Sequence, residues 1–329
     1  MIRAMLIDTQ KSGAVELETS QVLEHIQKRR RPFMWVDIVE EPPESSAELL
    51  THGFKFHPLA VEDALNEVHT PKVNDWDDFL YLVIRAIDLA NENEKPLETH
   101  EVDLFLGKNY LVTYQSRSIP AIQRTWDKTL AKLRHGPRIG STLLYRIADE
   151  IVDEYLTAID ELDVRIEDLE DRIFDDPQQE VVEEIFTLKR SLLHLRRILA
   201  PQREVFNKLA RGDFDLIPKQ DQLLFRDIYD HLVRLHDIIE SLRDLVGGSL
   251  ETYLSIVSNR MNEVMKTLTI FTALFMPLTF LTGFFGMNYF QPAITLSAWT
   301  GAEAFFVMMG LIIATPVLMY FWMRRRLWL

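Results

Sequence analysis

The strongest candidates for chemistry are three consecutive residues, Gly286, Met287 and Asn288, which open a short loop between two apolar runs. Asn288 offers a neutral amide oxygen, and Gly286 offers a backbone carbonyl that no side chain obstructs. Neutral oxygens suit Mg²⁺, which prefers octahedral oxygen coordination and gives up its water ligands reluctantly. One chain supplies too few such groups, so the motif predicts a selectivity ring built from several identical chains.

Two apolar segments flank this loop. Residues 268–285 contain no charge, and a helix of that length reaches about 27 Å, close to the hydrocarbon thickness of a bilayer. Residues 304–323 form a second apolar run of similar reach. We expect transmembrane helices over 267–287 and 302–323, an external loop over 288–301 and a basic tail over 324–329.

The positions of the basic residues predict how the two spans are oriented. Arg260 and Lys266 precede the first span and Arg324 to Arg326 follow the second, whereas residues 267–302 are uncharged. Because positive residues remain on the inner side, both termini should be cytoplasmic and the loop after Asn288 external. The N-terminus has no apolar core of signal-peptide length. A multi-pass protein of the cell (inner) membrane is therefore expected.

A long helix should lead into the first span. The helical pattern continues from Gln220 to Phe285, about 100 Å if unbroken, with Gly247-Gly248 as the point at which it could bend. Its part before the membrane, expected over 218–266, carries acids in one heptad register. Beyond the acids, the same face of the helix carries small residues, hydroxyl residues and methionines. This composition predicts a pore-lining face; the alternative is a close-packed pair of helices. The proposed pore residues are Glu251, Asn262, Met265, Thr272, Met276 and Thr279.

Residues 1–140 mix strand-like and helical segments and predict an α+β domain. The last strand-like stretch, residues 102–115, contains the hairpin signal Gly107-Lys108-Asn109. Other strand-like runs cover 1–10, 33–40 and 79–89, and helical candidates cover 20–30, 45–52, 58–65 and 119–135. The expected fold class is an α+β domain followed by long helices and two transmembrane helices.

Residues 141–217 predict a helical hairpin with charged halves. Residues 149–184 hold sixteen acids and two bases, residues 187–211 hold seven bases and one acid, and Asp176-Pro177 marks the turn. We expect the two helices to pair through opposite charges. A functional alternative, compatible with the first, is an acidic surface that attracts Mg²⁺.

Composition excludes several classes of protein. The net charge is −14, and because the last 63 residues hold three bases and one acid, residues 1–266 carry −16. Such acidity suits cations and argues against a nucleic-acid partner. The absence of cysteine rules out disulfides and thiolate metal sites. Motifs for phosphate binding or nucleophilic catalysis are missing, so neither an enzyme nor an organic cofactor is expected.

These residues together resemble the CorA family of magnesium channels. The likeness covers GMN preceded by MPLTFLTGFF and followed by Tyr289, the two closing spans, and the fragments FHPLAVEDALN and LFLGKNYLVTY. It implies a funnel-shaped homopentamer in the lipid bilayer, with the first span lining the pore and Asn288 in the outer ring. Transport would be passive influx of Mg²⁺, and of Co²⁺ or Ni²⁺ if these ions are accepted, driven by the membrane potential.

The resemblance also implies that Mg²⁺ regulates the protein as well as crossing it. Glu62 and Asp63 within HPLAVEDAL, with Asp227 within FRDIYDH, match positions that hold Mg²⁺ between subunits, and Asp149 matches a second such position. These acids could also have purely structural roles. Glu62 and Asp63 lie in the early turns of a helix, where acids interact favourably with the helix dipole, and Asp227 could pair with an arginine. Bound cations would close the pore.

Two alternatives stay open. One is a zinc or cobalt/nickel transporter of the same family. The other is a membrane-anchored coiled-coil scaffold that transports nothing, which would carry Leu or Phe in place of the threonine and asparagine stripe. The chain departs from the family pattern in one respect. Family members often carry an acid a few positions after the GMN motif, whereas here the nearest acid after Asn288 is Glu303. The resemblance therefore does not imply an acidic outer funnel for this chain.

Overall fold

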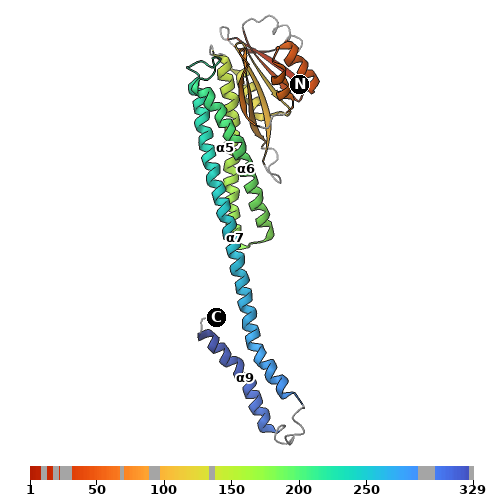
Figure 1. Cartoon of the computed structure of the whole chain (residues 1–329), viewed down its shortest axis with the longest axis vertical. Coiled ribbons are helices and arrows are strands. Elements are labelled where there is room, and N and C mark those ends of the chain that lie inside the picture. Colours follow the sequence, from red (N-terminus) through yellow and green to blue (C-terminus); the bar gives the residue numbers. More distant parts are fainter. Residues whose placement is uncertain are drawn as a thin grey trace. The chain divides into compact units, whose positions relative to one another are not determined.

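The computed structural model describes residues 1–8, 13–17, 22, 32–66, 70–88, 97–132, 138–287 and 301–325. Two compact units divide the chain, Met1–Leu250 and Glu251–Leu329, and each is treated by itself (Figure 1). Apart from Val22, the helix predicted over 20–30 lies outside the described residues, as do Asn288 and most of the loop that follows it.

The first unit begins with a seven-stranded sheet in the order β2-β1-β3-β7-β6-β5-β4. Neighbouring strands are antiparallel except β3 and β7, which run parallel. The central strands are buried on both faces, which explains their nearly continuous apolar sequences. The strands are β1 Ile2–Ile7, β2 Ala14–Leu17, β3 Phe33–Val39, β4 Lys72–Asp75, β5 Phe79–Asp88, β6 Glu98–Gly107 and β7 Tyr110–Gln115.

The apolar strand-like runs are confirmed as β1, β3, β5 and the β6–β7 hairpin. The sequence analysis missed β2 and β4, which have four residues each and contain both polar and apolar side chains without a regular pattern. It also began β6 four residues late, because the polar stretch Glu98 to Glu101 gave no apolar signal. That stretch is nevertheless paired with β5, in a register that places Asp88 opposite Glu98.

Short helices cover both faces of the sheet. On one face α2 (Pro43–Glu48), the π-helical turn η1 (Leu49–Gly53) and α3 (Pro58–Leu65) form a core with the strands around Phe56 and Phe105. The predicted bounds of α3 are confirmed: Pro58 is its first residue, and His57 Nδ1 caps it by accepting from the Leu59 N–H. On the other face, α4 (Pro120–Ala131) places Trp126 against Trp35, with ring centroids 4.8 Å apart.

A helical hairpin follows, formed by α5 (Ile139–Asp175) and α6 (Gln179–Arg211) with the turn at the predicted place. The expected pairing through opposite charges is wrong. Apolar stripes on both helices are buried, and the ion pairs Arg165–Glu184 and Arg172–Glu184 place the base on α5 and the acid on α6. Most acids of α5 face solvent, because burying charges costs more than pairing them returns.

The predicted long helix is confirmed as α7 (Gln222–Phe285), with 64 residues. Gly212, at φ 80°, ends α6 in the left-handed conformation that a glycine tolerates. Within the first unit α7 lies beside α5 and α6 (Figure 1), tied to them by Arg196–Glu240 and by a hydrogen bond between Ser249 and Glu170. Its buried stripe is Phe225, Ile228, Leu232, Leu235, Ile239, Leu242, Val246 and Ser249.

The second unit contains the end of α7 and the helix α9 (Ala302–Arg325). Both α7 and residues 305–325 of α9 contain apolar windows long enough to span a membrane, with mean hydropathies of 1.8 and 2.0. Large apolar side chains such as Phe280 and Phe306 are 68% and 71% exposed, although water would not favour this. A lipid environment satisfies them.

Candidate cation sites

Asp149, Asp227 and His231 form a compact cluster at the junction of α5 and α7. Each offers one ligand atom, and these atoms lie within 4.8 Å of one another. Asp227 and His231 are four residues apart on α7 and therefore share a face. Asp149 lies on α5, ten residues after the start of that helix. The cluster thus joins residues 78 or more positions apart in sequence.

Two polar contacts join the N-terminal parts of α5 and α7 beside this cluster. Arg138, the residue before α5, forms an ion pair with Asp221 at 3.2 Å. One turn before Asp149, the Tyr145 hydroxyl donates to Asp227 Oδ2 at 3.2 Å. The cluster is therefore built on two helices that are fixed to each other rather than on loops.

Negative charge at the cluster is poorly compensated. The pKa of Asp149 is raised, chiefly by burial and then by the carboxylates of Asp153 and Asp227, while His231 acts in the opposite direction. Burial, followed by Asp149 and Asp227, raises the pKa of Tyr145 to about 12. A divalent cation placed between the carboxylates would relieve this repulsion.

The donor set fits a divalent cation. Two carboxylates suit Mg²⁺, which keeps several of its water ligands in such sites. The imidazole of His231 is a borderline nitrogen ligand that favours Co²⁺, Ni²⁺ or Zn²⁺ over Mg²⁺. The sequence analysis did not select His231 or Tyr145, although the spacing of four residues from Asp227 and Asp149 was a signal that could have identified both.

Glu62 and Asp63, the other predicted regulatory ligands, lie on α3 and are not members of this cluster. Glu62 is exposed. Asp63 is half-buried and forms an ion pair with Lys72 of β4. Within one chain the structure therefore joins Asp149 to Asp227, a pairing that the sequence analysis did not make.

All six predicted pore-lining residues, Glu251 to Thr279, have exposed side chains on α7. The Thr272 and Thr279 hydroxyls donate to the carbonyls of Leu268 and Phe275, each at 2.9 Å. A hydroxyl has one proton, so the outward lone pairs of these oxygens can only accept. The hydrogens of a hydrated cation need such acceptors.

Gly286 ends this stripe in a turn after α7, where its N–H donates to the Thr282 carbonyl at 2.9 Å. A Cβ at Gly286 would lie 3.0 Å from that same carbonyl oxygen, so a larger residue would displace the turn. Met287 is 49% exposed. The position of Asn288 lies outside the described residues.

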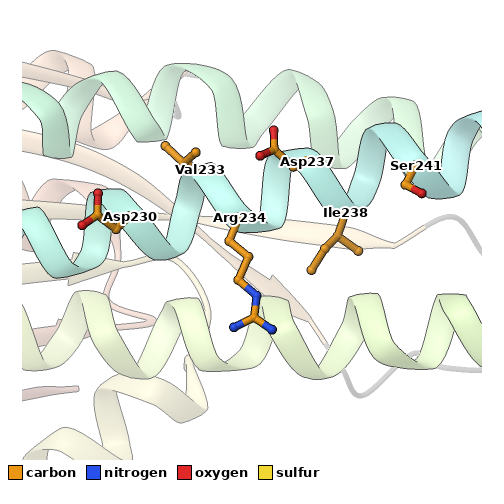
Figure 2. Close-up of a pocket in the computed structure, with 6 residues that line it drawn as sticks. All are labelled: Asp230, Val233, Arg234, Asp237, Ile238 and Ser241. Carbon is orange, nitrogen blue, oxygen red and sulfur yellow. The ribbon is translucent and has the colours of Figure 1, made fainter.

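Acids at heptad spacing mark the exposed side of α7 in the first unit. Asp230 and Asp237 line a shallow hollow together with Arg234 and Ile238. Figure 2 shows Asp237 on one side of the helix and both Arg234 and Ile238 on the other. This surface is opposite the buried stripe, so it remains available to another subunit or to ions.

Two apolar helices of membrane-spanning length and a carboxylate–imidazole cluster are features expected of a membrane protein that handles divalent cations. Residues 31–325 match the family described as CorA-like Mg²⁺ transporter protein, and the chain belongs to this family. The family comprises transporters rather than enzymes, which agrees with the class predicted from the sequence.

Relatives include transporters of different ions. The cobalt/magnesium transport protein CorA of Thermotoga maritima is 35% identical over 301 residues, covering 90% of this chain and 83% of the relative. The zinc transport protein ZntB of Pectobacterium carotovorum is 28% identical over 281 residues, covering 83% and 81%. The complete structure of the CorA magnesium transporter from Methanocaldococcus jannaschii matches 100% of this chain and 99% of its own, with a TM-score of 0.81 and 23% identity. The α+β fold with long helices and two apolar C-terminal helices is thus confirmed.

Proposed function

We propose that five copies of this chain surround a pore lined by α7 and pass Mg²⁺ passively. The observation that carries the proposal is a stripe on α7 that begins at the exposed acid Glu251 and continues to Thr279 through exposed amide, hydroxyl and thioether side chains. The other faces of the apolar segment of α7 carry bulky apolar side chains. In a closed ring these stripes would face one another, while Phe271, Phe275 and Phe280 would face lipid or neighbouring helices. Asn288 would form the outer selectivity ring.

Membrane potential supplies the driving force in this proposal. A divalent cation gains about 4.6 kcal/mol for each 100 mV of inside-negative potential, so no chemical fuel is required. Within its apolar segment the proposed stripe binds cations weakly, because the described residues from Thr267 to Met287 include no acid and Glu251 lies before this segment. An ion that meets only neutral oxygens can leave as readily as it enters.

Internal Mg²⁺ would close this pore. The cluster of Asp149, Asp227 and His231 supports regulation, because its carboxylates repel until a cation binds. We further propose that Asp63 of one subunit shares a cation with Asp227 of its neighbour. A coupling free energy of about 1–3 kcal/mol per site between cation binding and pore closure, summed over five subunits, would shift the equilibrium strongly toward the closed state.

Both termini would be cytoplasmic in this arrangement, as the basic residues at both inner ends indicate. A cysteine at Ser297 is expected to react with a membrane-impermeant maleimide from outside intact cells. A cysteine at Lys108, an exposed residue of the β6–β7 turn, should react only after the cells are opened. Labelling in the reverse order would overturn the orientation.

Ion flux into liposomes tests the function itself. Purified protein should admit Mg²⁺ without nucleotide, at a rate that rises with an inside-negative potential. Parallel measurements with Co²⁺, Ni²⁺ and Zn²⁺ address the second candidate, a zinc or cobalt/nickel transporter, which the His231 ligand and the zinc-transporting relatives favour. Flux of Zn²⁺ but not Mg²⁺ would select that candidate, and no flux of any ion would select the non-transporting scaffold.

A further inference from the structure

A chain of charged and polar groups runs from the surface of α3 into the core of the sheet. Lys72 of β4 forms the ion pair with Asp63, and its ammonium also lies 5.4 Å from the centroid of the Tyr81 ring on β5. The Tyr81 hydroxyl donates to Asp103 Oδ1 of β6 at 2.6 Å. Four consecutive elements of the domain thus contribute one residue each.

The two carboxylates at the ends of this chain differ sharply in burial. The Asp63 side chain is 38% exposed, whereas Asp103 is 2% exposed and Tyr81 is fully buried. Burial, and then the charge of Glu101, raises the pKa of Asp103 well above its usual range, while the Tyr81 hydrogen bond and the charge of Lys72 lower it. Lys72 therefore acts on both carboxylates, one by direct contact and the other through space.

We propose that Lys72 is a tethered competitor for the cation site at Asp63. Its ammonium occupies Asp63 when no divalent cation is bound, and it moves toward Tyr81 and Asp103 when a cation takes its place. The inference rests on the proposed function in one respect, since it takes Asp63 to be a regulatory cation ligand.

Charge balance explains why Asp103 matters. A cation and an ammonium cannot both contact the same Asp63 oxygen without strong repulsion. Lys72 has four rotatable methylenes, so its charge can travel while its backbone remains in β4. The face of Tyr81 stabilises the ammonium along this path, and Asp103, whose raised pKa the charge of Lys72 lowers, offers its carboxyl group at the end of it. The affinity of Asp63 for a cation is then set partly by how well the interior accepts the displaced ammonium.

The proposal predicts opposite effects from two substitutions. Lys72→Met removes the competitor and should tighten Mg²⁺ binding at Asp63 by about 1.5- to 5-fold, the range that a partly exposed ion pair supports. Asp103→Asn removes the alternative partner and should weaken Mg²⁺ binding by a similar factor. The asparagine oxygen can still accept from Tyr81. Lys108→Met, which removes an exposed lysine from the β6–β7 turn, is the matched control and should change nothing.

The experiment is a Mg²⁺ titration of the full-length protein in detergent, followed by calorimetry and by the rise in melting temperature. The variant Asp63→Ala distinguishes the proposed competitor role of Lys72 from the proposed role of Asp63 as a regulatory cation ligand. If Asp63→Ala leaves Mg²⁺ binding unchanged, Asp63 is not a ligand and both ideas fail. If Asp63→Ala weakens binding but Lys72→Met does not tighten it, Asp63 remains a ligand and the competitor role of Lys72 is overturned. Loss of folding cannot imitate the expected result, since one variant must bind more tightly than the wild type.

Discussion

Replacing Asn288 by alanine is expected to abolish Mg²⁺ flux and leave the oligomer assembled. In the proposed ring this side chain binds the water shell of the ion rather than packing against protein, so its loss removes selectivity without removing a core contact. Losing five neutral oxygens at one level of the pore would lower flux by two orders of magnitude or more, since each lost hydrogen bond to a charged group is worth about 1.5–3 kcal/mol. Liposome uptake measures the flux, and size-exclusion chromatography measures assembly.

A matched control for this substitution is Asn207→Ala. Asn207 is a partly exposed amide on α6 that donates to Glu204, and its removal should leave uptake at the wild-type rate. Wild-type flux through a correctly assembled Asn288→Ala protein would exclude Asn288 from the selectivity ring. The transport function and the pore-lining stripe would then need a different site of ion selection.

Elements with strong periodicity were predictable from the sequence. The helix α7 differs from its predicted start by two residues, because no Gly or Pro competes with its apolar stripe before Gly247. The strands β2 and β4 were not predictable, since four residues with mixed polarity carry little pattern. They form because β1 and β5 present unpaired edges to them. Tertiary pairing supplies what their local sequence lacks.

Charge patterns misled the prediction for the helical hairpin. Sixteen acids facing seven bases suggested an electrostatic interface, but side chains such as Leu162 and Leu188 are buried and the acids are turned outward. The net charge of a segment shows which residue types it contains but not which side chains face the partner helix. Burial depends on the 3.6-residue period of apolar residues within the segment. The apolar period was present in both helices and was the better guide.

Candidate ligands could be named from the sequence, but their grouping could not. Asp149 and Asp227 were both selected, yet 78 positions separate them and only the packing of α5 against α7 brings them together. Asp63 was selected as well, but its contact with Lys72 depends on the placement of β4, a strand the sequence analysis missed. Distances between ligands follow from tertiary structure, and no residue spacing along the chain encodes them.

Removing one carboxylate from the cluster of Asp149, Asp227 and His231 should have opposite effects with and without a cation. The raised pKa of Asp149 means that its ionised form destabilises the folded protein. This penalty is full at neutral pH and disappears as the pH falls through the raised pKa and below the ordinary value of 3.8. Asp149→Asn should therefore raise the melting temperature of the metal-free protein, by about 1–3 °C at neutral pH, and this advantage should vanish in acid.

With a divalent cation present the order should reverse. A cation that binds only the folded protein stabilises it by about 2.7 kcal/mol at a concentration 100 times its Kd, and both Asp149→Asn and Asp227→Asn should lose most of that gain. Inhibition of channel current by internal Mg²⁺ should move to higher Mg²⁺ in both variants, because the closed state loses the ion that stabilises it. The control Asp160→Asn removes an exposed acid of α5 outside the cluster and should follow the wild type in every measurement. Superimposable inhibition curves for all four proteins would show that the cluster is not the sensor, and the melting curves would then decide whether it binds a cation at all.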